Sequence, residues 1–399
     1  MKGYVVVGGG LAGLTAANAL AGESRHKVTL LEQSSGLGGR AITQQDRGYF
    51  LNLGPHALHR NGVAARTLRG WGVPFSGKPP DTSSSSFLVR NGRMYPQVFT
   101  TRGLLTTRLF NAGEKLQAAR VLKQLSSGPA NEGESFKEWI EQRTPSPRVR
   151  EFVAMLMRVS TYSADLSLLS ARPALEQFRS ATTGGVLYLD GGWQTLIAGL
   201  EQRARQLGVE IQRGKPIETL AEIEGNGIVL AVPPAAVERI TGRRLPAMHP
   251  VRVACLDLGL RTLPRFAARV ALGVDRPLYL SVHSTVARLA PDGAALVHAC
   301  KYLGGRADAI SDRRELEQFV DLAIPDWREH AEVIRFLPEM TVTPAVCSLQ
   351  GRPAIDQLGV PGVVLAGDWV AGEGMLADAA VATGLRAAGL IQRQRLDAA

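Results

Sequence analysis

The chain has 399 residues, 45% of them hydrophobic, and a formal net charge of +10 at pH 7. This length and apolar content predict a globular protein of two or three domains or lobes. A disulfide-built scaffold is excluded, because the three cysteines are scattered at positions 255, 300 and 347. They also lack metal-ligand spacing, so we expect a reducing, cytoplasmic setting and no bound metal.

No apolar run approaches the length of a membrane span, and nothing precedes the first strand, so we expect neither a transmembrane helix nor a signal peptide. The positive charge is concentrated between Arg60 and Leu125, where eleven Lys and Arg face two acidic residues, a net charge of +9. This predicts an anionic neighbour such as lipid headgroups, a phosphorylated substrate or a partner protein, or else a solvated face. No nucleic-acid-binding motif accompanies the charge, so nucleic acid is not expected.

The chain opens with a pattern typical of dinucleotide binding. Residues 4–7 predict a buried strand, the run Gly8-x-Gly10-x-x-Gly13 a tight turn, and residues 11–21 a helix. The glycines allow the turn, the approach of a pyrophosphate and close packing of helix on strand. A second strand over residues 28–31 ends at Glu32, where a carboxylate can bind a ribose diol.

Two further features favour FAD over NAD. Gly38-Gly39-Arg40 adds backbone donors and a guanidinium behind Glu32, and arginine binds phosphate through charge-assisted hydrogen bonds. Far along the chain, a strand over residues 362–366 ends at Gly367-Asp368, and a helix follows from Met375. FAD is long, and this second site can hold its ribityl and flavin end.

The middle of the chain alternates between stretches that predict strands and stretches that predict helices. Residues 48–58 predict a strand running into a Gly-Pro turn, and residues 60–190 are mostly helical, with a short strand at 87–89. Ser135 and Glu138 fit a capping box at a helix start. Residues 187–232 return to strand, helix and two strands, residues 251–302 predict a four-stranded antiparallel meander, and helices at 312–331 precede a strand at 332–337.

We therefore predict an α/β (α+β) fold in which a Rossmann-type FAD-binding domain is assembled from three segments. These are residues 1–60, 185–250 and 338–399. Residues 61–184 and 251–337 would form an interleaved substrate-binding domain of helices and an antiparallel sheet.

The sequence resembles the FAD-dependent amine oxidase superfamily, which includes monoamine oxidases, protoporphyrinogen oxidases and phytoene or carotenoid desaturases. The resemblance covers most of the chain and is carried by Val5–Gly13, Leu31–Glu32, Gly36–Arg40, Gly54–His56, Tyr188–Leu196, Ile228–Pro234 and Gly367–Ala388. Residues 159–165, 169–171 and 374–378 look most like the desaturase and protoporphyrinogen-oxidase branch.

The resemblance implies a set of contacts to non-covalent FAD. The pyrophosphate would lie on Gly8, Gly10, Leu11, Ala12, Gly13, Gly38, Gly39 and Arg40. Glu32 and Gln33 would hold the adenosine ribose, and the backbone of Ile217 the adenine. Gly367 and Asp368 would hold the ribityl or phosphate end. Leu376 and the turn Gly54-Pro55-His56 would lie at the flavin.

His56 is the one catalytic candidate, because it follows the turn expected under the flavin and could tune the ring, pair with an anion or shuttle a proton. The alternative, which we prefer, is a histidine hydrogen-bonded to stabilise that turn; His59 is a weaker candidate. Lys301 lies too close to Gly367 for the lysine of amine oxidases, and we expect it to be structural or solvent-facing. The pattern around Cys347 does not match a covalent flavin site. Trp193 and Trp369 could frame a substrate or simply pack.

The leading function is an FAD-dependent oxidoreductase that dehydrogenates or desaturates a hydrophobic small molecule by hydride transfer to flavin N5. The absence of a second dinucleotide motif disfavours a built-in NADPH site, so the electrons would leave to oxygen, a quinone or another acceptor. The alternatives are an amine oxidase, a non-redox FAD-dependent isomerase or mutase, and a non-catalytic escort-type protein. Leucines and basic residues between 102 and 125 predict a helix over residues 104–125 that either covers the substrate lobe or contacts a membrane surface peripherally.

Overall fold

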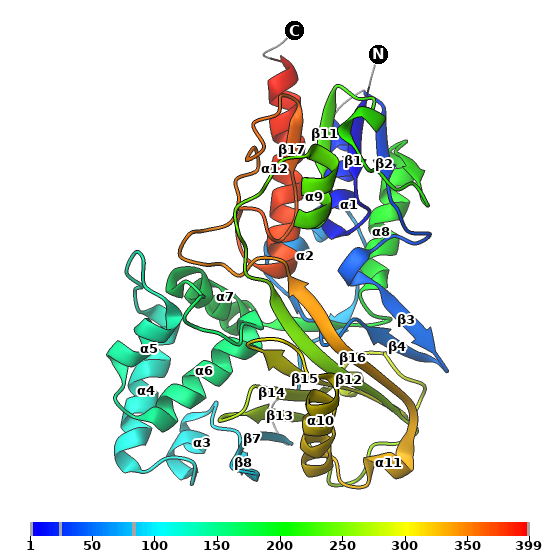
Figure 1. The fold of residues 1–399 in the computed structure, drawn as a ribbon. Coiled ribbons are helices and arrows are strands. Elements are labelled where there is room, and N and C mark those ends of the chain that lie inside the picture. Colours follow the sequence, from blue (N-terminus) through cyan, green and yellow to red (C-terminus); the bar gives the residue numbers. More distant parts are fainter. Residues whose placement is uncertain (1–2, 24–25, 82–84, 397–399) are drawn as a thin grey trace.

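The computed structural model describes residues 3–23, 26–81 and 85–396. Its described helices and strands form an upper α/β part and a lower part made of a large sheet beside a group of helices (Figure 1). In that part of the chain, no helix is long and apolar enough to cross a membrane.

A five-stranded parallel sheet forms the centre of the α/β part, in the order β10-β2-β1-β11-β17. Its strands come from three distant stretches: β1 Tyr4–Val7, β2 Val28–Leu31, β10 Glu210–Gln212, β11 Gly227–Leu230 and β17 Val363–Leu365. All residues of β1, β11 and β17 are buried. Their continuous apolar runs are what a parallel sheet covered on both faces requires.

Helix α1 (Leu11–Glu23) follows the first turn and is buried along its whole first ten residues. It packs against the last helix, α12 (Leu376–Leu396), and against α8 (Gln194–Gln206). Asn18 of α1 donates to the Leu200 carbonyl of α8 at 3.0 Å. This burial on several sides explains the alanine-rich composition of α1, because small side chains let neighbouring helices approach closely.

The lower part is organised on a seven-stranded sheet, in the order β16-β12-β15-β14-β13-β7-β8. Its strands are β7 Ser86–Arg90, β8 Arg93–Pro96, β12 Val251–Leu260, β13 Val270–Gly273, β14 Leu278–Val282, β15 Ala295–Leu303 and β16 Ala331–Thr343. Neighbours are antiparallel except β7 and β13, which pair in parallel. The boundary expected at residue 338 is wrong, because β16 continues to Thr343 and its register with β12 keeps residues 340–343 in this sheet.

Helices cover the remaining surfaces. α10 (Ala309–Ala323) and α11 (Trp327–His330) lie against the large sheet. α2 (Val63–Gly70), α9 (Pro234–Thr241) and α8 belong to the α/β part.

Short sheets join β3 (Thr43–Asp46) to β4 (Tyr49–Asn52), and β5 (Leu58–His59) and β6 (Gly77–Lys78) to β9 (Val186–Leu189). Single 3-10 turns occupy Gly39–Ala41, Leu220–Glu222 and His283–Thr285.

The helical insertion consists of α3 Thr101–Thr106, α4 Ala112–Ser127, α5 Phe136–Arg143, α6 Pro147–Thr161 and α7 Ala171–Gly184. The capping box predicted at Ser135 and Glu138 is confirmed at the start of α5. The single helix expected over residues 104–125 is wrong, because the chain breaks between α3 and α4. Asn111 and Glu114 form a second capping box there, which starts a new helix.

Candidate active site

A cavity of about 680 Å³ lies between the α/β part and the lower part, within the range of roughly 300–1,000 Å³ for ligand pockets. Its walls come from all three stretches of the parallel sheet and from the helical insertion. Every cofactor-contact residue expected from the sequence lies in its lining except Gly13 and Gly54.

The two glycine turns lie against each other at one wall. Gly38 donates its N–H to the Gly9 carbonyl at 2.9 Å, and Gly10 pairs with Gly38 in an isolated bridge. Gly8 has a φ of +106°, which favours glycine. Gly13 lies outside the cavity for a packing reason: a Cβ there would be 1.9 Å from the Gly8 carbonyl oxygen, whereas a Cβ on Gly10 would meet nothing closer than 3.9 Å.

Glu32 lies at the end of β2 beside the first turn. Its carboxylate accepts the N–H of Gly9 at 2.7 Å and that of Ser34 at 2.8 Å. Both bonds come from backbone, so the carboxylate is fixed in place while still lining the cavity. An acceptor held this way suits the hydroxyl donors of a ribose.

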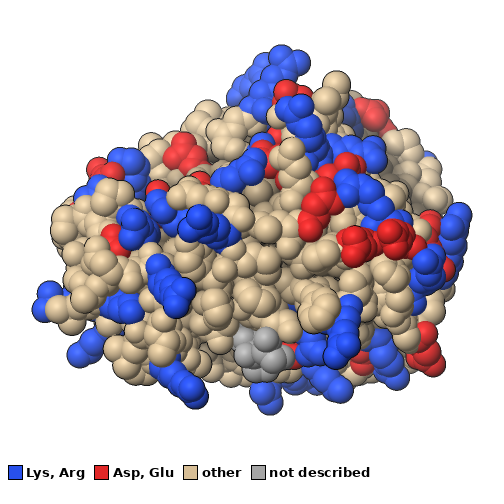
Figure 2. Space-filling model, turned by 90° about the horizontal axis from the view of Figure 1, so that it is seen from below, with Lys and Arg blue, Asp and Glu red and all other residues tan. Residues whose placement is uncertain are grey.

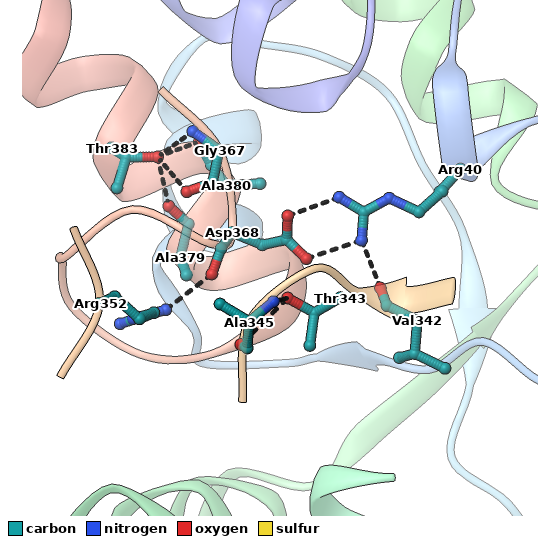
Figure 3. Close-up of polar contacts among 10 residues, drawn as sticks. All are labelled: Arg40, Val342, Thr343, Ala345, Arg352, Gly367, Asp368, Ala379, Ala380 and Thr383. Atoms are coloured by element: carbon teal, nitrogen blue, oxygen red, sulfur yellow. Dashed lines mark hydrogen bonds and ion pairs between the residues drawn. The ribbon is translucent and has the colours of Figure 1, made fainter. Parts of the chain in front are cut away.

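Arg40 and Asp368 meet across the cavity. The guanidinium makes two bonds to the carboxylate, Nη1 to Oδ2 at 2.7 Å and Nη2 to Oδ1 at 2.5 Å, and also donates to the Val342 carbonyl (Figure 3). Asp368 is buried, whereas the Arg40 side chain is 44% exposed toward the cavity. Arg40 can therefore also meet a phosphate without leaving its partner.

The loop from Asp368 to α12 is held by its own polar contacts. Arg352 donates to the carbonyls of Asp368, Gly372 and Gly374 at 2.7–3.0 Å. Thr383 of α12 accepts from the Gly367 N–H at 3.0 Å (Figure 3). Leu376, the first residue of α12, has a φ of +54°, an uncommon conformation for a leucine. It lines the cavity together with Ala377 and Asp378 of the same helix start.

His56 and Trp193 form the wall next to the Gly-Pro turn. The rings meet edge to face at 4.9 Å between centroids, and His56 Nδ1 lies 3.1 Å from the Gly54 carbonyl, to which it donates. Burial lowers the pKa of His56 to about 4, so its ring is neutral at pH 7. The hydrogen bond to the turn matches the stabilising role preferred from the sequence. The nearby Gly54 has a φ of +77°, and a Cβ there would be 2.9 Å from Cys255 Sγ. The turn therefore requires glycine at this position, although Gly54 does not line the cavity.

Sequence reasoning missed several lining residues. Around Ile217 the wall is completed by Lys215, Arg239 and the Pro233–Ala236 turn into α9; Pro233-Pro234, read as a strand end, was the available signal. On the opposite side the structure adds Tyr162, Gln177, His59 and Asp378. These come from elements far apart in sequence, and no motif marked them as a group.

The structure separates the other candidates. Trp193 and Trp369 both line the cavity. Lys301 lies away from it, pairing with Asp312 at 2.6 Å and Glu315 at 2.5 Å, in agreement with the structural role expected for it. All three cysteines are buried and none contributes to the lining.

The residues fit FAD on two observations. The indole N–H of Trp193 is buried and has no partner among the described residues, although the ring lines the cavity; such orphaned donors are rare without a ligand. The glycine turns, the α1 start and Glu32 together supply phosphate donors and a ribose acceptor. This geometry is that of a dinucleotide-binding site.

Comparison with known proteins gives the family. Residues 11–245 match the model described as flavin containing amine oxidoreductase. The match covers more than half of the chain, so the chain belongs to this family of flavin-containing oxidoreductases.

Individual relatives are more distant. An L-amino-acid oxidase from Naja atra is 41% identical over 95 residues, which cover 23% of this chain and 18% of that protein. The chain thus matches less than a fifth of that relative's length. A protein provisionally assigned as a protoporphyrinogen oxidase from Exiguobacterium sp. 255-15 superimposes with a TM-score of 0.72 at 17% identity, covering 99% of both chains. Putrescine oxidase bound to putrescine gives 0.73 at 17%, covering 98% of this chain and 99% of that one. These likenesses show a shared fold.

Proposed function

We propose that this enzyme dehydrogenates or desaturates a hydrophobic small molecule, with the 17 cofactor contacts expected from the sequence as its FAD site. One observation carries the proposal: apart from the expected cofactor contacts, the lining of the cavity is largely apolar. It includes Leu53, Ala57, Met340, Val342 and Met375. Such a wall favours an apolar substrate, since it offers few polar partners.

When bound, FAD would supply the oxidising power as a hydride acceptor. The chain supplies position and environment. Glu32 would hold the ribose, the glycine turns and Arg40 would hold the phosphates, and the positive end of the α12 helix dipole would favour negative charge beside it. The neutral His56 ring and Trp193 close the wall and exclude water. Oxygen or a quinone would then remove the electrons.

Amine oxidation is the second candidate, favoured by the likeness to putrescine oxidase and L-amino-acid oxidase. Tyr162 and Trp193 bring aromatic rings to the cavity. Against it, Lys215 is the sole lysine among the described lining residues, and its N–H bonds the Glu32 carbonyl at 2.8 Å on the ribose side. Nothing at the apolar wall repeats the lysine that amine oxidases use.

Anaerobic mixing separates these candidates. The FAD-loaded enzyme is mixed with an apolar polyene, a reduced tetrapyrrole, benzylamine, putrescine or an L-amino acid, and flavin absorbance near ~450 nm is followed. Bleaching by the polyene or the tetrapyrrole is expected. Bleaching by the amines alone would support amine oxidation instead. Conversion of a donor only after prior reduction of the flavin, without net electron transfer, would identify an isomerase.

We further propose that α3 and α4 contact an anionic membrane surface peripherally. Leu116, Arg120 and Lys123 share one face of α4 by their spacing. Leu116 is 54% exposed, and Leu105 of the neighbouring α3 is 65% exposed. Figure 2 shows Lys and Arg side chains around wide uncharged areas on the lower face of the helical part, on the left of the view. Apolar side chains flanked by basic ones suit lipid headgroups.

Vesicle flotation tests the membrane contact. Binding should require phosphatidylserine over phosphatidylcholine alone and should weaken as salt rises. Arg120→Glu should reduce it several-fold, whereas the matched reversal Arg393→Glu, on an exposed residue near the end of α12, should not. If both variants bound the vesicles equally well, the proposal that α3 and α4 contact the membrane would be contradicted.

A further inference from the structure

A second polar cluster lies in the cavity wall where α7 and the start of α12 approach β5. His59, Gln177 and Asp378 all line the cavity there. The His59 side chain is 11% exposed and that of Asp378 is 10% exposed. Two nearly buried titratable groups in a mostly apolar wall are costly to maintain unless they interact, and they mark functional sites more often than chance.

The two ring nitrogens of His59 differ in how closely they are contacted. His59 Nδ1 lies 3.0 Å from Ser180 Oγ and 3.6 Å from Asp378 Oδ2. Its Nε2 has a single long contact, 3.4 Å to the amide nitrogen of Gln177. That amide also donates to the Ser160 carbonyl at 3.3 Å. Nε2 is therefore the position at which a proton can be gained or lost.

Asp378 is fixed independently of the histidine. Its Oδ1 accepts the N–H of Ala64 at the start of α2, at 2.8 Å. Gly62 lies so close that a Cβ there would be 2.3 Å from both carboxylate oxygens, so only glycine fits beneath the carboxylate. The pair thus links β5, α2 and α12 around the cavity, with the carboxylate positioned behind the imidazole.

The charged side chains around Asp378 have little net effect on its pKa. Arg66 of α2 and Glu373 before α12 both act on Asp378, in opposite directions. They pair with each other at 3.5 Å and are well exposed, so solvent screens their effect. Burial raises the pKa of Asp378 and lowers that of His59. Burial therefore disfavours the charged form of both groups.

We propose that His59 and Asp378 form the proton-exchanging site of this enzyme, a role that rests on the dehydrogenation proposed above. When the substrate loses a hydride to the bound FAD, a neighbouring C–H or N–H bond must also break. Its electron pair becomes the second bond of the C=C or C=N product, and its proton forms an N–H bond at His59 Nε2. Asp378 stabilises the imidazolium from the Nδ1 side, and the Gln177 amide nitrogen, which donates to the neutral Nε2, holds the ring before the transfer.

The test measures protons and needs no substrate. The FAD-loaded enzyme is reduced anaerobically with dithionite near pH 7, and proton uptake per two electrons is recorded with a pH indicator. Negative charge placed on the cofactor should draw a proton onto the nearby pair. The wild type should therefore take up more protons than His59→Gln, by up to about one per two electrons.

Two further variants keep the result interpretable. Asp378→Asn retains an acceptor for Ala64 and should also lose the extra uptake, which serves if His59→Gln folds poorly. His330→Gln, at the end of α11 outside the cavity lining, should match the wild type. Equal uptake by wild type, His59→Gln and Asp378→Asn would overturn the proposal, as would an equal loss in His330→Gln. The two proposals can also fail separately. If the variants lose proton uptake as expected but no candidate substrate bleaches the flavin, the proton-exchanging site is supported and the dehydrogenase function is overturned.

Discussion

Arg40 and Asp368, 328 residues apart in sequence, form a bidentate ion pair across the cavity. The pair joins the turn after β2 to the turn after β17, and it therefore connects the two ends of the expected cofactor site. Because the carboxylate is buried and the guanidinium half-exposed, removing the arginine leaves a buried charge unpaired, which is strongly destabilising.

We predict that Arg40→Gln and Asp368→Asn each weaken FAD binding by about 10- to 100-fold, a loss of roughly 1.4–2.8 kcal/mol. Isothermal titration of the FAD-free protein measures this. Because the residues act as a unit, the double variant should lose less than the sum of the two single losses. Strict additivity would show that Arg40 and Asp368 act on FAD separately.

The glycines of the first turn should respond differently to substitution. Gly10→Val adds a side chain into open cavity space, so the fold should persist while FAD binding is lost. Gly13→Ala places its Cβ 1.9 Å from the Gly8 carbonyl oxygen, so it should lower the melting temperature of the FAD-free protein. Thermal unfolding and flavin content of the two purified variants provide the comparison, and a reversed pattern would contradict the assigned roles.

Stability should fall at acid pH through His56. Its pKa is lowered from 6.5 to about 4 by burial. A depressed native pKa gives stability that is present above pH 6.5 and lost as pH falls toward 4, since the unfolded state binds the proton more readily. The loss should be on the order of 1–3 kcal/mol. His56→Gln should show a flatter dependence of unfolding free energy on pH across this window, and an unchanged slope would count against a buried, neutral ring.

Arg352 should act on the cofactor site without lining it. Its three bonds to the carbonyls of residues 368, 372 and 374 hold the loop that leads to α12. Arg352→Gln should weaken FAD binding about tenfold and broaden the visible flavin spectrum. Arg386 is a matched control, since it makes one longer bond, 3.2 Å, to the Ala371 carbonyl of the same loop. Equal effects of Arg352→Gln and Arg386→Gln would contradict a special role for Arg352.

The sequence was most informative where local chemistry determines the structure. The strand, glycine turn and helix at residues 4–21 follow from steric needs that only glycine meets, and the Ser135 capping box needs only four residues to be recognised. Glu32 was found because it ends a buried strand. These features depend on neighbours close in the chain, so a pattern is enough to predict them.

Other features depend on contacts between distant segments. Strand β3 (Thr43–Asp46) is polar and mostly exposed, so no alternation marked it; it is a strand because β4 folds back on it. The pairing of His59 with Asp378 requires α12 to pack on α2, which no local pattern encodes. The cavity residues around the glycine turns were therefore predictable, and those around His59 and Asp378 were not.

The most direct measurement of the central claim, that three distant segments build one FAD site, is a titration of the purified protein with FAD, followed by removal of unbound cofactor. One flavin per chain should remain, with absorbance near ~450 nm. Glu32→Ala, from the first segment, and Asp368→Asn, from the last, should each reduce that amount. Full flavin retention by both variants, or no retained flavin in the wild type, would contradict the claim.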